Sequence, residues 1–166
     1  NRVPSDMSAQ YHLLTTEADY RPACDAVIGR ARRDFAIFDR NLVPLRLNET
    51  SRVDMLSTFL QDDPTRRMRV VVHEPDDLEK IAPRLLRLVA RFSHAIDVRQ
   101  SPDNLRHLAD THVLADDEHG VRRFQFDLPR SALIIEDPAY ISPWRLRFEE
   151  LWELSHPCLN LNTTGL

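Results

Sequence analysis

The stretch DTHVLADDEHGVRRFQF, residues 110–126, decides the fold. An apolar run over 111–116 ends in two aspartates, and an alternating run over 121–127 follows the tetrapeptide DEHG. Two such runs joined by turn-forming residues predict the two strands of a β-hairpin, in which Gly120 supplies a positive φ. The hairpin comes late in the chain, after segments that alternate between helix and strand. Because the first run contains His112, the hairpin is also a candidate for chemistry.

Outward from this hairpin, the hydrophobic pattern predicts helices and strands in alternation. The predicted strands are 35–38, 69–73, 95–99 and 132–136, with 11–14 as a tail or an edge strand; the predicted helices are about 19–33, 48–60, 76–92 with a break near Pro83, and 142–156 with Ser142 as its N-cap. This order predicts one α/β domain over residues 1–166, with a mixed, mostly parallel sheet, a late antiparallel hairpin and helices on both faces. Residues 1–15 and 157–166 are expected to be arms.

Composition argues against several classes of function. The chain has 166 residues and a net charge of −4, which predicts no general attraction to nucleic acid or to anionic lipid. No apolar run approaches the ~20 residues that span a bilayer, so no membrane partner is expected. Only three glycines are present, too few for the loops that bind nucleotide phosphates, and Lys80 is the only lysine among 22 basic residues.

The two cysteines and the first residue bear on the setting of the chain. Cys24 and Cys158 are too few and too far apart to form a disulfide framework, so a reduced, cytoplasmic setting is expected. The chain starts at Asn1 and has no visible signal peptide. We therefore expect a fragment of a longer protein, with a domain missing before it.

The order of elements over about 34–155 resembles one half of the phospholipase D superfamily. DFAIFD, RMRVVVHE and HAIDVR are similar to that family's core strands, and SALIIEDPAYISPWRLRFEELWELS is similar to its last strand and terminal helix. The family's F-x-x-L-W pattern at the end of this helix is reproduced by Phe148, Leu151 and Trp152. The resemblance implies a phospholipase D-like half and, because such halves pair about a two-fold axis, a homodimer.

A narrower resemblance concerns residues 83–99 and 108–124. Both segments are similar to an uncharacterised bacterial domain that often follows a GNAT-type N-acetyltransferase. The resemblance implies that the missing N-terminal domain is of this type. Nothing in the chain resembles the acetyl-CoA-binding motif of those enzymes, so any transferase would lie in the missing part.

The phospholipase D motif, H-x-K-x4-D, is absent in every register. In that family the histidine attacks phosphorus, the lysine holds phosphate oxygens and the aspartate supports the site. Starting from His112 places leucine and histidine in the lysine and aspartate positions, whereas starting from Asp117 places Asp110 in the histidine position and His112 in the lysine position. Lys80 is remote in sequence from this strand. We therefore predict a degenerate site with no catalytic residues.

Other residues are candidates for binding a ligand, a metal ion or a phosphate. His112 most simply pairs with a nearby carboxylate or carbonyl, and the candidate ligand-binding set is His112, Asp116, Arg122 and Arg123. The acidic turn ADDEHG could hold a cation, but exposed turns are often acidic without one, so we predict no metal and no cofactor. The arginines at 84, 87 and 91 share a helical face that could bind phosphate or an acidic partner; a solvated face balanced by nearby acids is the simpler interpretation.

These patterns favour a non-catalytic, phospholipase D-like accessory or docking domain of a larger bacterial protein, with no enzyme activity expected for this domain alone. The alternatives are a divergent phosphodiesterase or nuclease with a rebuilt site, and a nucleic-acid-binding module, although nucleic acid is not the expected partner. The three differ in what should surround His112. An enzyme needs converging polar groups in a cleft, a nucleic-acid binder needs clustered arginines, and a docking domain needs an apolar patch.

Overall fold

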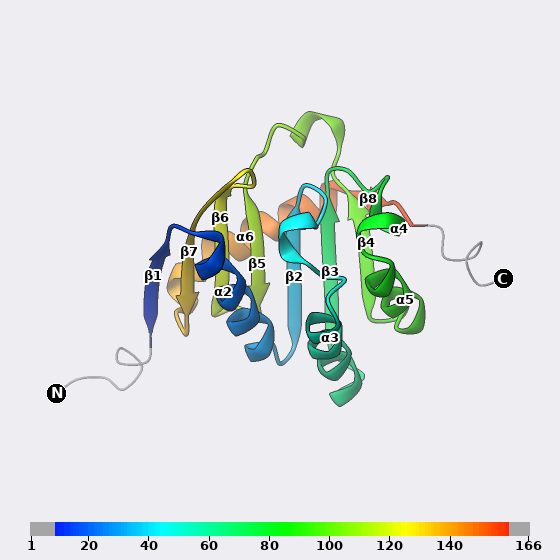
Figure 1. Ribbon diagram of the computed structural model, residues 1–166, viewed down its shortest axis with the longest axis horizontal. Helices are drawn as coiled ribbons and strands as arrows, with labels where there is room; N and C mark the ends of the chain where they lie inside the picture. Colours follow the sequence, from blue (N-terminus) through cyan, green and yellow to red (C-terminus); the bar gives the residue numbers. More distant parts are fainter. Residues whose placement is uncertain (1–8, 160–166) are drawn as a thin grey trace.

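A computed structural model describes residues 9–159. Its middle layer is a single eight-stranded sheet in the order β1-β7-β6-β5-β2-β3-β4-β8 (Figure 1). The strands are β1 (Gln10–Leu14), β2 (Asp34–Asp39), β3 (Arg67–Val72), β4 (Ile96–Gln100), β5 (Thr111–Ala115), β6 (His119–Gln125), β7 (Leu128–Ile135) and β8 (His156–Pro157). All six strands predicted for one sheet are therefore present in it, and the stretch from Tyr11 forms an edge strand.

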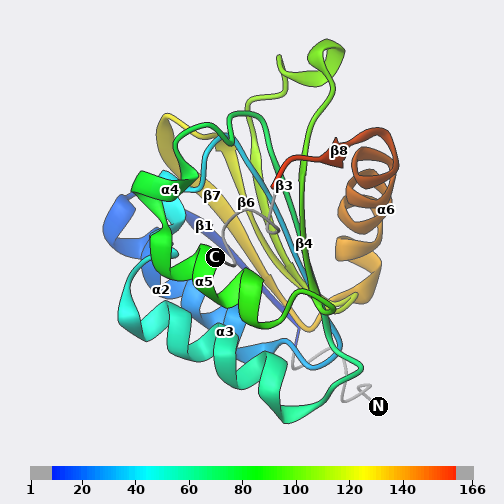
Figure 2. The same cartoon turned by 90° about the vertical axis from the view of Figure 1, so that its right-hand side faces the viewer.

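Helices cover both faces of the sheet, as predicted (Figure 2). Four helices lie on one face and a single long helix lies on the other. The helices are α2 (Glu17–Arg30), α3 (Thr50–Asp62), α4 (Leu78–Ile81) and α5 (Pro83–Arg91) on the first face and α6 (Pro138–Leu154) on the second; two 3-10 turns, η1 (Val43–Leu45) and η2 (Asp103–Leu105), lie in loops. The predicted break near Pro83 separates α4 from α5.

The sheet is mixed, which confirms the α/β class, but the expected majority of parallel pairs is not found. Only β2 with β3 and β3 with β4 pair in parallel. The other five pairings are antiparallel. The reason is that β5 returns beside β2 and not beyond β4, so the hairpin, β7 and β1 all extend the sheet in antiparallel order on that side.

The turn of the hairpin differs from the prediction. Asp116, and not Gly120, has the positive φ, at 56°, and no described glycine has one. Gly120 lies inside β6, where a Cβ atom would stand 2.8 Å from Leu114 Cδ2 and 3.0 Å from Ile141 Cδ1. Glycine is needed at this position because α6 packs closely against the strand, and the conformation of the turn is a separate matter.

Two helices begin earlier than predicted. The hydroxyl of Thr16, and not the carboxylate of Asp19, caps α2 by accepting a hydrogen bond from the backbone of residue 19. Asp137 caps α6 in the same way through the backbone N–H of Tyr140, so Ser142 lies inside the helix. Both caps are a side-chain oxygen just before the helix, as the physical rule requires.

The face under α6 has its own small apolar core. Ala36, Phe38, Val71 and Leu114 of the sheet pack against Phe148, Leu151 and Trp152 of the helix. Trp152 is 7% exposed and stacks on Phe148, so it is a structural residue of this core. Within residues 9–159, no helix is long and apolar enough to cross a membrane.

The close approach at Gly120 yields a paired test of stability. Gly120→Ala should lower the free energy of unfolding by about 1–3 kcal/mol, because the added methyl would overpack Leu114 and Ile141, both fully buried. Gly29→Ala is the matched control: the same methyl at 29 meets only Met55 Cε at 3.6 Å inside α2, and should raise stability by up to about 1 kcal/mol. Urea unfolding measures both. Equal effects of the two substitutions would mean that α6 does not sit this close to β6.

Candidate functional site

A buried carboxylate joins three segments of the chain next to β5. Asp110, 5% exposed, lies just before that strand. Arg147 of α6 donates two hydrogen bonds to it, from Nη1 to Oδ2 at 2.7 Å and from Nη2 to Oδ1 at 2.8 Å. Arg122 of β6 adds a third from Nε at 3.2 Å. The result is a two-arginine clamp on one carboxylate, with the bidentate geometry that makes such pairs strong.

His112 lies beside this carboxylate but is closed off from solvent. It is 1% exposed, and its ring stacks on Trp144 of α6 with 5.4 Å between the ring centroids. Neither ring nitrogen has a hydrogen-bond partner; Nε2 is 3.5 Å from Asp110 Oδ2. Burial lowers the pKa of His112 to about 3, against the pull of Asp110 in the other direction. The imidazole is therefore neutral at pH 7 and out of reach of a substrate.

The Asp110 carboxylate is ionised. Burial alone would raise its pKa, but the hydrogen bonds from Arg147 and the charges of Arg147 and Arg122 lower the pKa below its usual value. A carboxylate that is held at both oxygens by guanidinium groups is a weak nucleophile and a weak base. The chemistry of this site is that of a fixed ion pair.

Three arginines reach the surface around this site. The side chains of Arg122 and Arg147 are 36% and 32% exposed. The guanidinium groups of Arg122 and Arg130 both lie over the ring of Phe124, at 5.5 and 5.9 Å from its centroid. We call Arg122, Phe124, Arg130 and Arg147 the arginine strip. It carries more positive charge than Asp110 neutralises.

Arg123 does not belong to the same site as Arg122. Successive residues of a strand point to opposite faces of the sheet, so Arg123 lies on the α2 side. It is 3% exposed, its guanidinium lies 4.9 Å from the centroid of the Tyr20 ring, and Nη2 donates to Glu17. The predicted ligand-binding set is thus divided: His112 and Arg122 are together, and Arg123 is on the other face.

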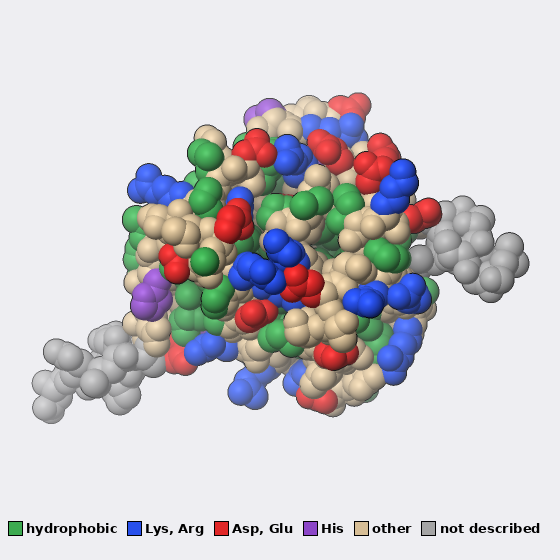
Figure 3. Space-filling view, in the orientation of Figure 1, with side chains coloured by type: hydrophobic (Ala, Val, Ile, Leu, Met, Phe, Trp, Pro, Cys, Tyr) green, Lys and Arg blue, Asp and Glu red, His purple; other side chains and the backbone are tan. Residues whose placement is uncertain are grey.

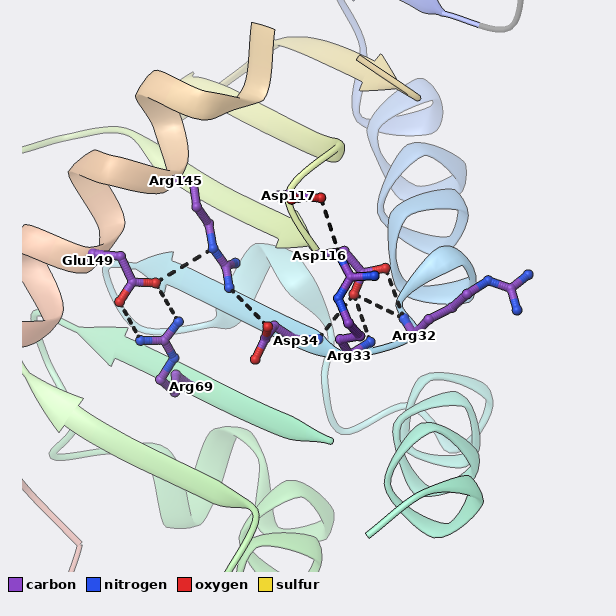
Figure 4. Close-up of polar contacts among 8 residues, drawn as sticks. All are labelled: Arg32, Arg33, Asp34, Arg69, Asp116, Asp117, Arg145 and Glu149. Atoms are coloured by element: carbon purple, nitrogen blue, oxygen red, sulfur yellow. Dashed lines mark hydrogen bonds and ion pairs between the residues drawn. The ribbon is translucent and has the colours of Figure 1, made fainter. Parts of the chain in front are cut away.

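Asp116 lies apart from both, at the opposite end of β5 (Figure 4). Its carboxylate accepts hydrogen bonds from the backbone N–H groups of Arg32 at 3.2 Å, Arg33 at 2.8 Å and Asp34 at 3.1 Å. These bonds fix the turn between α2 and β2. The carboxylate is already engaged, and within residues 9–159 no group of three or more metal-ligating side chains includes it.

A second charged network near Asp116 was not predicted. Arg69 of β3 pairs with both oxygens of Glu149, at 2.7 and 2.6 Å, and Arg145 of α6 lies 3.6 Å from Glu149 and 3.7 Å from Asp34 (Figure 4). This network attaches α6 to the first residues of β2 and β3. Its partners are far apart in the sequence, so no local pattern could have identified it.

The helical arginines at 84, 87 and 91 are exposed, as expected of a solvated face, but within residues 9–159 they form no ion pair with the acids expected to balance them. On the face covered by α2 to α5, basic and acidic side chains are interspersed (Figure 3). Arg84 bonds to the backbone carbonyl of Asn48 and to the hydroxyl of Thr50, which ties the start of α5 to that of α3. Arg147 and Trp144 were missed as site residues because only the packing of α6 on the sheet brings them to Asp110.

Comparisons with solved structures identify the fold. The chain superposes on Nuc, a phospholipase D family member from Salmonella typhimurium, with a TM-score of 0.65 at 12% identity, covering 92% of this chain and 99% of that one. It also superposes on the phosphatidylserine synthase of Haemophilus influenzae, with a TM-score of 0.58 at 11% identity, covering 93% of this chain and 40% of that one. At these identities the likeness establishes a phospholipase D-like fold.

An archaeal chromatin protein, TrmBL2, which binds DNA, matches equally well. The TM-score is 0.65 at 9% identity over 90% of this chain, which spans about half, 54%, of that protein. No curated protein matches the chain in sequence. The family model described as "Domain of unknown function (DUF7931)" matches residues 16–163.

The buried imidazole predicts how stability depends on pH. The pKa of His112 is lowered on folding from 6.5 to about 3, so the unfolded chain takes up a proton that the folded chain excludes. Stability should therefore fall as the pH falls from about 6.5 towards 3, by about 1 kcal/mol per pH unit for this residue. His112→Phe should remove this part of the slope. The pKa values of His73 and His119 are also lowered, and both residues remain in the variant.

The measurement is urea unfolding of both proteins at pH 7, 6 and 5. The wild type should lose more stability than the variant between pH 6 and pH 5. Parallel pH profiles would show that His112 is protonated in the folded state and is not enclosed as described.

Proposed function

The chain belongs to the DUF7931 family, and we propose that it is a non-catalytic, phospholipase D-like accessory domain that docks within a larger bacterial protein. The observation that carries the proposal is the state of Asp110 and His112. When Asp117 is aligned with the aspartate of the phospholipase D motif, H-x-K-x4-D, Asp110 falls in the histidine position and His112 in the lysine position. The first is an arginine-bound carboxylate and the second a buried neutral imidazole, so neither supports attack on phosphorus.

A docking role is supported by apolar side chains that remain exposed beside α6. Tyr11 and Leu13 of β1 are 52% and 47% exposed, and Tyr140 of α6 is 43% exposed. The rings of Tyr11 and Tyr140 are in contact, with 5.7 Å between their centroids. We call these three residues the apolar rim. Exposed apolar patches mark interaction sites, and tyrosine is enriched in protein interfaces.

The proposed partners are another domain of a larger protein and a second copy of this chain. We propose that the domain docks within a larger cytoplasmic bacterial protein, with a GNAT-type acetyltransferase as the candidate partner domain. A homodimer of the phospholipase D type is the other proposal for association. Both are compatible with a domain that contributes binding and not catalysis.

The test of non-catalysis is a hydrolysis assay. Purified protein should release no more product than a blank from bis(p-nitrophenyl) phosphate and from single-stranded DNA. His112→Ala and Asp110→Asn should give the same blank reading. Turnover well above blank that disappears in either variant would overturn the proposal in favour of a phosphodiesterase with a rebuilt site.

A second candidate function is nucleic-acid binding, and the arginine strip is the observation that favours it. Guanidinium groups can bind phosphates while an aromatic ring such as Phe124 stacks on a base. The archaeal chromatin protein with the same fold binds DNA. The net charge of −4 argues against a general affinity, so any binding would depend on the strip.

Fluorescence anisotropy with a labelled single-stranded oligonucleotide separates the two candidates. A nucleic-acid module should bind with an affinity that falls with salt, and Arg130→Ala should weaken binding and reduce the slope of log affinity against log salt by about 1. Arg87→Ala, an exposed arginine on α5, is the matched control and should change nothing. The docking proposal expects no salt-dependent binding by any of the three proteins.

A further inference from the structure

The two edges of the sheet are treated differently. At one edge, β8 pairs with β4 through Arg99–Pro157 and Gln100–His156. Pro157 has no N–H group, so it cannot donate to a further strand. At the other edge, β1 pairs with β7 over five residues, and no segment within residues 9–159 pairs with its outer side (Figure 1). Among the described residues, β1 is therefore unpaired along its outer side, whereas the last two residues of β4 are paired by β8.

Nothing in β1 blocks the approach of another strand. Its sequence, QYHLL, contains no proline and no charged residue, and its pairing with β7 runs from Gln10 to Leu14 without a bulge. Proteins commonly protect an edge with lysine, proline or a bulge, because free N–H and C=O groups bind other strands. β1 lacks all three.

The side chains of β1 are also uncovered. Four of its five residues are exposed and only Leu14 is partly buried. Tyr11 and Leu13 alternate along the strand and so project from the same face of the sheet, the α6 face, where Tyr11 contacts Tyr140. An apolar strand exposed in this way gains stability when another strand adds to it.

We propose that β1 is a dimerisation edge, which pairs antiparallel with β1 of a second copy of this chain about a two-fold axis at His12. This inference names a partner for the apolar rim and so rests on the proposed docking function. In this register Tyr11 faces Leu13 of the second copy, Gln10 faces Leu14, and His12 faces itself. The aromatic–aliphatic pair is stabilising across strands, and an uncharged edge brings no repulsion.

A second copy fits this edge better than an unrelated strand because the contact is self-complementary and closes on itself. Pairing about a two-fold axis uses the same five-residue edge of both copies, whereas at the other edge of the sheet the two-residue strand β8 ends in Pro157. Pairing through β1 therefore stops at two subunits. A five-residue strand pair buries less than the ~1,200 Å² of stable interfaces, so the dimer should be weak and depend on concentration.

The test is cross-linking of defined register, with Cys158→Ser as the background because Cys158 is the partly exposed thiol and Cys24 is buried. His12→Cys should give a covalent dimer on mild oxidation, because residues directly opposite in an antiparallel pair have Cα atoms about 4.5–5.5 Å apart, within disulfide range. Tyr11→Cys alone should remain monomeric. A mixture of Tyr11→Cys and Leu13→Cys proteins should cross-link.

Sedimentation of the uncross-linked chain provides the second measurement. The wild type should show a concentration-dependent dimer, and Leu13→Lys, which places a charge at the edge, should be monomeric with an unchanged urea midpoint. A monomeric His12→Cys protein after oxidation, or dimers formed equally by all single cysteine variants, would overturn the inference. Failure here with blank hydrolysis leaves the non-catalytic docking proposal in place, whereas turnover in the hydrolysis assay overturns that proposal and not the dimer.

Discussion

The ion pair between Asp110 and Arg147 is the contact on which the site depends. It is made by a carboxylate that is 5% exposed, and it connects the residue before β5 to the middle of α6. Because a buried charge without a partner is costly, the two arginines around Asp110 are needed to keep its ionised carboxylate in this position. Once α6 is held there, Trp144 covers His112, and the imidazole is sealed away from solvent.

The same contact is the basis of the proposal that this phospholipase D-like fold is not catalytic. In the family, a histidine and a lysine at these positions act on a phosphodiester. Here the site is occupied by charges that satisfy one another, and the outer surface keeps arginines and an apolar rim. This arrangement is compatible with the proposed binding role.

The sequence predicted the elements well because their signals are local. Apolar runs, prolines and the F-x-x-L-W pattern located the strands and α6, whereas of the four predicted site residues only His112 and Arg122 lie together. The parallel share of the sheet could not be predicted, since it depends on where β5 inserts beside β2. Arg147 was missed because its partner lies 37 residues away, and Gly120 was assigned to the turn although its small size serves the packing of α6.

The adjacent arginines of β6 have a consequence for how the hairpin assembles. Arg122 ends at Asp110 on one face and Arg123 ends at Glu17 on the other. If β6 paired one residue out of step, each guanidinium would move to the wrong side and two charges would enter apolar surroundings without partners. Arg122 and Arg123 therefore fix the register of the hairpin. A hairpin shifted by one residue is destabilised on both faces of the sheet, and only the native register allows both arginines to pair with their acids.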